Sequence, residues 1–261
     1  RKIIPAHFSL KKSLYINIRL ELVFMALPKV GYPTYELDLP STGKTIKYRP
    51  FLVKEEKVLL LALESEDEKQ ITSAVKDLIK NCVISRIKVD TLPLFDLEYL
   101  FLKIRGASIG ETITLTVTCL DDNETKAETQ INIDDIQVFK PKGHSNKIEL
   151  TDEMGIVMKY PSMQRFIELD FLQKELDAEE VFELIAESID QIYDSEEVFD
   201  STTTTKKEFR TFVEGLTTKQ FEKIQQFYET SPKLRHQFTV VNPNTGVDSE
   251  YTLEGLQSFF V

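Results

Sequence analysis

Hydrophobic and polar side chains alternate around one Pro-Ser-Thr-Gly-Lys segment in a way that predicts a β-hairpin. Tyr35, Leu37 and Leu39 alternate with polar residues before this segment, and Ile46 and Tyr48 alternate after it. A period of two residues is typical of a strand with one buried face, and Pro and Gly favour turns. We therefore expect two short antiparallel strands joined by this turn.

The same alternation predicts two more hairpins. Residues 111–120 and 126–133 alternate on either side of an acidic turn that contains Asp121 and Asp122. Near the end of the chain, residues 234–240 alternate before an Asn-Pro-Asn-Thr-Gly turn, and we expect a short terminal helix over residues 253–260.

The first half also shows a helical period. Residues 52–63 place Leu52, Val53, Leu59, Leu60 and Leu63 on one expected buried face, with charged residues opposite. A second stripe ends at Cys82, which we expect to be buried, and residues 92–106 are apolar almost all round, with Gly106 well placed to end that helix.

In the second half, residues 177–194 predict one helix that starts with a capping box of Asp177 and Glu180. Its expected buried stripe is Val181, Phe182, Ile185, Ile189 and Ile192. Two further helices are predicted by capping boxes at Thr205 with Glu208 and at Thr217 with Gln220.

The elements together predict an α+β fold with two hairpin-containing regions and packed amphipathic helices. A basic, turn-rich segment over residues 140–147 is the expected boundary, which gives an N-terminal α+β region over residues 25–145. Residues 146–261 then form a C-terminal, acidic and mainly helical region with a terminal hairpin.

Residues 1–24 carry five basic residues against one acidic residue, and the first residue is Arg. Arg19 and Glu21 interrupt the apolar part of this segment, which does not fit a signal peptide. Met25 opens a segment that is typical of an ordinary start. We expect residues 1–24 to be a non-native upstream extension.

The segment from Leu39 to Thr45, LPSTGKT, matches parts of two known motifs. A phosphate-binding P-loop needs a glycine where this chain has Asp38, and no helix is predicted to follow Lys44. An L-P-x-T-G sorting signal lies near a C-terminus, which is not its place here. Both matches are interpreted as accidents of a hairpin turn.

Residues 106–110, GASIG, match the G-x-S-x-G nucleophile elbow of serine hydrolases. That elbow holds its serine between a strand and a following helix, whereas here a helix is expected before Ser108 and a strand after it. No later histidine lies in a segment typical of a catalytic partner. A hydrolase that uses Ser108 is kept only as a remote alternative.

Composition narrows the function further. The chain has 261 residues, a net charge of −11, two cysteines and three histidines. This charge does not fit a nucleic-acid surface, and no apolar run reaches the length of a membrane span. The Asp121–Glu124 turn lacks the spacing and glycine of a calcium loop. We expect no metal, cofactor, small-molecule substrate or enzymatic activity.

Several segments resemble one known family. They are RPF at 49–51, EEKVLL at 55–60, DLEYLFLKIRGASIGE at 96–111, LTTKQFEKIQQFYETSPKLRH at 216–236 and NPNTGVDSEYTLEGLQSFF at 242–260. From Met25 to Val261 the chain resembles the baseplate hub protein family of T-even-type contractile-tailed bacteriophages. This resemblance implies a structural or assembly role among other hub or tail proteins, in the host bacterial cytoplasm and in the virion tail.

The resemblance leaves one alternative open, a dissociable tail-assembly chaperone that is absent from the mature virion. Aromatic anchors often dominate protein interfaces, so aromatic residues near turns and at the terminus are the predicted contact residues. They are Tyr48, Phe51, Tyr160, Phe259 and Phe260.

Overall fold

The computed structural model describes residues 31–65, 67–162 and 177–255. The chain divides into two units, residues 1–33 and 34–261, and the description below concerns the second. The proposed upstream extension over residues 1–24 lies outside the described residues, as do Phe259 and Phe260.

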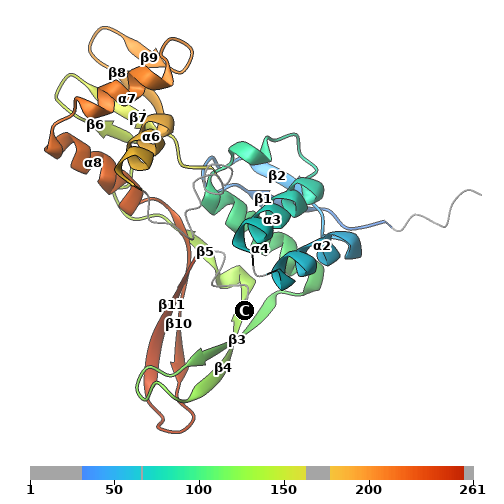
Figure 1. The fold of residues 1–261 in the computed structure, drawn as a ribbon. Helices are drawn as coiled ribbons and strands as arrows, with labels where there is room; N and C mark the ends of the chain where they lie inside the picture. Colours follow the sequence, from blue (N-terminus) through green and yellow to red (C-terminus); the bar gives the residue numbers. More distant parts are fainter. Residues whose placement is uncertain (1–30, 66, 163–176, 256–261) are drawn as a thin grey trace, which may run out of the picture. The chain divides into compact units, whose positions relative to one another are not determined.

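The described residues form six α-helices and eleven strands, which confirms the predicted α+β class (Figure 1). The helices are α2 (Val53–Glu64), α3 (Glu68–Cys82), α4 (Leu94–Ile109), α6 (Ala178–Ser188), α7 (Lys206–Glu214) and α8 (Thr218–Glu229). The strands are β1 (Tyr35–Asp38), β2 (Thr45–Tyr48), β3 (Thr112–Thr118), β4 (Lys126–Asn132), β5 (Gln137–Phe139), β6 (Lys147–Glu149), β7 (Gly155–Met158), β8 (Ile189–Tyr193), β9 (Val198–Asp200), β10 (Lys233–Val241) and β11 (Asp248–Glu254). They pair into small antiparallel sheets ordered β1-β2, β3-β4, β11-β10-β5 and β6-β7-β8-β9.

The predicted first hairpin is confirmed. Strand β1 pairs with β2 in the register Tyr35↔Tyr48, and Gly43 adopts a φ of 68° in the turn between them. Leu39 and Ile46 are buried in a core that surrounds α4. The LPSTGKT segment is therefore a hairpin turn, and no helix follows it.

Helix α4 is the centre of this first core and is buried on nearly every side. The predicted end at Gly106 is wrong, because the helix continues to Ile109 and ends before Gly110, whose φ is 122°. Gly106 instead lies inside the helix, where a side-chain methyl group would make ordinary contacts. A Cβ there would lie 3.5 Å from the Ile133 side chain.

A second core joins the β6–β9 sheet to helices α6, α7 and α8, which gather beside it in Figure 1. The capping boxes of α6 and α7 are present as predicted. The prediction of one helix over residues 177–194 is wrong, because α6 ends at Ser188 and β8 begins at Ile189. Ile189 and Ile192 are β-branched residues and pair with β7 and β9, so sheet formation outweighs the helical period.

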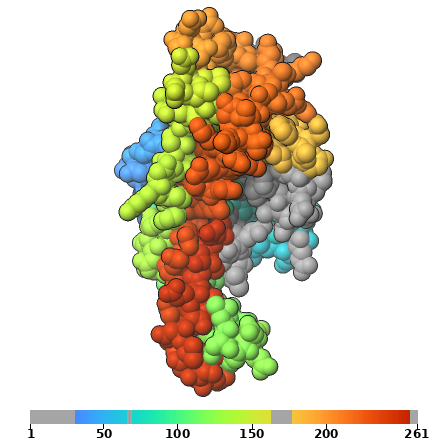
Figure 2. Space-filling model, turned by 90° about the vertical axis from the view of Figure 1, so that its left-hand side faces the viewer, coloured from blue at the N-terminus to red at the C-terminus, as the bar shows by residue number. Residues whose placement is uncertain are grey.

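Strands β10 and β11 form a long hairpin that lies beside the β3–β4 hairpin in Figure 2. Its Asn-Pro-Asn-Thr-Gly turn is confirmed. Leu253 and Glu254, predicted as the start of a helix, belong to β11 instead, because they pair with β10 residues; the rest of that predicted helix lies outside the described residues. Leu234 of β10 is buried in the first core, and the predicted boundary near residue 145 stays a prediction.

Candidate interaction surface

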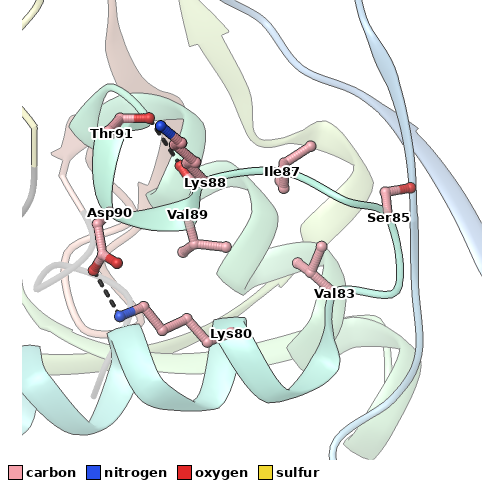
Figure 3. Close-up of a pocket in the computed structure, with 8 residues that line it drawn as sticks. All are labelled: Lys80, Val83, Ser85, Ile87, Lys88, Val89, Asp90 and Thr91. Atoms are coloured by element: carbon pink, nitrogen blue, oxygen red, sulfur yellow. Dashed lines mark hydrogen bonds and ion pairs between the residues drawn. The ribbon is translucent and has the colours of Figure 1, made fainter.

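The pocket in Figure 3 is a hollow of about 390 Å³ after α3. Its wall includes Lys80, whose Nζ lies 2.7 Å from Asp90 Oδ1, and Ser85, whose hydroxyl accepts a hydrogen bond from the Lys47 N–H. Lys80 and Asp90 of this wall form an ion pair, and Lys88 is a second basic group on it. Nothing in the arrangement pairs a nucleophile with a base.

Ser108 has a structural position. Its hydroxyl donates a hydrogen bond of 2.6 Å to the Ile104 carbonyl and accepts one of 2.9 Å from the Phe51 N–H. These contacts tie the last turn of α4 to the segment before α2. The hydroxyl therefore acts as both a donor and an acceptor within the fold.

The acidic turn after β3 is satisfied by side-chain donors. Asn242 donates through Nδ2 to Asp121 and Asp122, and the Thr245 hydroxyl donates to Asp121 over 2.6 Å. Hydrogen bonds from Asn242 and Thr245 lower the pKa of Asp121. Among the described residues, no group of three or more His, Cys, Asp or Glu side chains could hold a metal ion.

Both cysteines are buried and free, as predicted for Cys82. Burial raises the pKa of the Cys82 thiol to about 11, so the thiolate is disfavoured at neutral pH. His236 stacks on Phe238, and its Nδ1 lies 3.3 Å from the Asp135 carbonyl. These contacts give His236 a structural position.

The surface with the clearest capacity for interaction is on helix α2. A buried ion pair holds the first turn of this helix, with Arg49 Nη2 lying 3.1 Å from Glu55 Oε1. The same guanidinium donates to the carbonyls of Asn81 and Pro50, which joins α2 to the end of α3. The Glu55 carboxylate also accepts a 2.7 Å hydrogen bond from the Leu52 N–H.

The contact between Arg49 and Glu55 is electrostatic. Burial alone would raise the pKa of Glu55, but the hydrogen bonds from Arg49 and Leu52 outweigh it, and the pKa lies below its ordinary value. The carboxylate is therefore ionised opposite a cation that is also buried. Polar contacts therefore attach the start of α2 to the rest of the fold.

Three residues of α2 are buried. Two of them, Leu59 and Ala62, are apolar, and the third is Glu55. The expected stripe is wrong in part, because Leu52, Val53 and Leu60 are exposed. The outward side of the helix exposes four large apolar residues: Val53 is 80% exposed, Val58 53%, Leu60 52% and Leu61 56%. Exposed apolar clusters of this kind mark interaction sites.

Sequence reasoning missed this surface although the signal was present. The run from Val58 to Leu63 reads VLLLAL, which is apolar on more sides than a half-buried helix needs. The predicted stripe was wrong because it placed some of these surplus apolar residues in the core.

Two predicted contact residues lie inside the first core. Tyr48 is 5% exposed and stacks on Tyr35, and Phe51 is 9% exposed. As contact residues for a partner they stay predictions.

Tyr160 is half-buried within an aromatic group. Its ring stacks on Phe227, and its ring centroid lies 5.1 Å from that of Phe95 in an edge-to-face arrangement. Its hydroxyl lies 2.8 Å from His144 Nε2. His144 Nδ1 in turn lies 2.9 Å from the Thr230 hydroxyl. Burial and the nearby Lys140 lower the pKa of His144. The group holds the segment around Tyr160 in place, and a role for Tyr160 in partner contact stays a prediction.

No described helix combines the length and apolar character of a membrane span. The described residues present an exposed apolar helix face on α2, and exposed apolar patches are typical of protein interaction sites. The chain matches the family model of the T4 bacteriophage base plate protein over residues 32–261 and belongs to that family. Comparison with curated proteins gave no match, and neither did comparison with solved structures.

Proposed function

We propose that this protein is a non-enzymatic structural component of the baseplate hub of a contractile-tailed bacteriophage. The observation that carries the proposal is the family match over residues 32–261, which spans all the described elements. The residues quoted for the hub resemblance, among them EEKVLL at 55–60, support the hub in particular. The partners are other proteins of the baseplate.

The chemistry of the described side chains supports a structural role. Ser108 uses its hydroxyl within the fold, and Asp121 and Asp122 are occupied by donors from the neighbouring hairpin. The exposed face of α2 supplies apolar area that a neighbour in an assembly would cover. The place of action is the host cytoplasm during assembly and the tail baseplate of the virion afterwards.

Quantitative mass spectrometry of purified virions tests the proposal. We expect the chain at a fixed ratio to the other baseplate proteins, and cross-linking within intact baseplates should join it to hub neighbours. Its absence from mature particles, with presence in assembly intermediates, would instead establish the dissociable chaperone.

Location within the particle tests the hub assignment separately. Density for the chain on the tail axis in an electron-microscopy reconstruction is expected, and density at the periphery would leave it a baseplate protein outside the hub.

A further inference from the structure

We infer that the exposed face of α2 binds the α2 face of a second copy of this chain, with the two helices antiparallel about a two-fold axis. The inference rests on the α2 surface alone. It stands or falls independently of whether the protein occupies the hub.

The first argument is the arrangement of side chains. At 3.6 residues per turn, Val53, Lys57, Leu60, Leu61 and Glu64 fall within an arc of about 100° on the side opposite the buried residues. These five residues therefore form one continuous stripe, in which Leu60 and Leu61 lie between Lys57 and Glu64 and Val53 lies beyond Lys57. All five are exposed.

The second argument is that the charges on this stripe complement themselves. Lys57 lies three residues before Leu60, and Glu64 lies three residues after Leu61. A two-fold axis between Leu60 and Leu61 sets these leucines against their symmetry mates. The same operation places Lys57 of each copy opposite Glu64 of the other, and a two-fold interface makes this contact twice.

A parallel pairing fails the same test, because it would set Lys57 against Lys57 and Glu64 against Glu64. Like charges that face each other across an interface select against such an arrangement. Among the described residues, neither Lys57 nor Glu64 forms an ion pair within the chain. As far as residues 31–65, 67–162 and 177–255 are concerned, both charges are available to a second copy.

The area that the two helices can bury sets the expected affinity of the dimer. A helix of 12 residues is about 18 Å long, and two such helices bury less than the roughly 1,200–2,000 Å² of a standard stable interface. We expect a weak dimer with a Kd on the order of 10–100 µM, which a baseplate would reinforce through additional contacts.

Sedimentation of the full chain over about 5–500 µM measures this association directly. The mean mass should rise with concentration from 30.1 kDa toward twice that value. Leu60→Glu should remove the rise. Val247→Glu is the matched control, because it introduces the same charge at an exposed apolar position outside α2, and it should leave the dimer intact.

Charge exchange tests the register. Lys57→Glu and Glu64→Lys should each raise the Kd about fivefold to tenfold, since each creates two like-charge contacts. The double variant Lys57→Glu/Glu64→Lys should restore the wild-type value. Two single defects without restoration in the double variant would overturn the paired contact.

Cysteine cross-linking tests the direction. A mixture of Lys57→Cys and Glu64→Cys chains should form mixed disulfide dimers on oxidation, while the buried Cys82 and Cys119 stay free. Cross-links only between identical chains would overturn the antiparallel arrangement. A chain that is monomeric over the whole concentration range would overturn the inference itself and leave the baseplate role standing.

Discussion

Arg49 and Glu55 form a buried ion pair in which Nη2 lies 3.1 Å from Oε1, at exposed side-chain fractions of 9% and 4%. The pair joins the segment before α2 to the first turn of that helix, and the guanidinium reaches the end of α3 as well. Because α2 is held by polar contacts here, its opposite side need not enter the core. This relationship makes an exposed apolar helix face compatible with a stable fold.

Removal of one partner of this pair should be costly. We expect Glu55→Gln to lower the free energy of unfolding by about 3–5 kcal/mol, because the charge attraction between Arg49 and Glu55 would be lost at a buried site. Chemical denaturation measures the loss. Glu56→Gln, at the next position of the same turn, should change stability by less than about 0.5 kcal/mol.

The stability that Glu55→Gln loses should depend on pH. The pKa of Glu55 is lowered in the folded state, so its stabilising effect is present above the unfolded-state pKa and is lost as pH falls through the folded-state pKa. The stability difference between wild type and Glu55→Gln should therefore shrink in acid. A difference that stays constant down to that range would show that the carboxylate charge is not the cause.

Asp96 should behave in the opposite way. Burial raises its pKa, and this is offset only in part by hydrogen bonds from the Ser41 hydroxyl and N–H. An acid whose folded-state pKa is raised loses stabilisation as pH increases through that value. Asp96→Asn should thus raise Tm at pH 7 by about 2–4 °C, equivalent to about 1 kcal/mol, and the gain should vanish in acid. A lower Tm for Asp96→Asn at pH 7 would contradict this account.

Asn242 should control the junction of the two hairpins. It is buried, and its Nδ2 donates to both Asp121 and Asp122. We expect Asn242→Ala to cost about 1–3 kcal/mol and to increase hydrogen exchange at the adjoining ends of β3, β4, β10 and β11. Asn244→Ala, which removes one exposed side-chain contact with Thr125, should have a small effect.

Two glycines should respond to alanine in opposite ways. At Gly155 a Cβ would lie 2.7 Å from the Ile148 carbonyl oxygen and 2.2 Å from the Tyr193 hydroxyl, so Gly155→Ala should destabilise the protein by about 1–3 kcal/mol or more. At Gly106 a Cβ meets only ordinary contacts inside α4, and Gly106→Ala should stabilise by about 0.4–1 kcal/mol. Thermal unfolding of the two variants compares them directly.

Ser108→Ala separates structure from catalysis. The Phe51 N–H would lose its acceptor, and we expect a loss of about 1–3 kcal/mol in the free energy of unfolding. Phage that carry this change should remain infectious at temperatures where the variant is folded. Loss of plaques with unchanged stability would contradict a non-enzymatic role.

Particular elements show how much of the fold could be predicted from the sequence. The Asp177 and Thr205 capping boxes and the first hairpin could be predicted because their signals lie within a few neighbouring residues. The change from α6 to β8 at Ile189 could not, because it depends on pairing with strand β7, which comes from a distant part of the chain.

The same division applies to the candidate surface. The sequence by itself predicted a helix over residues 52–63, which the structure has at Val53–Glu64, because propensity and periodicity are local properties. Only the tertiary structure decided which of them face solvent. Asn81 and Ser108 come from separate segments and hydrogen-bond to Arg49 and Phe51 just before α2. Arg49 in turn binds Glu55 in the first turn, and these contacts fix the rotation of the helix about its axis. That rotation leaves Leu60 and Leu61 outside.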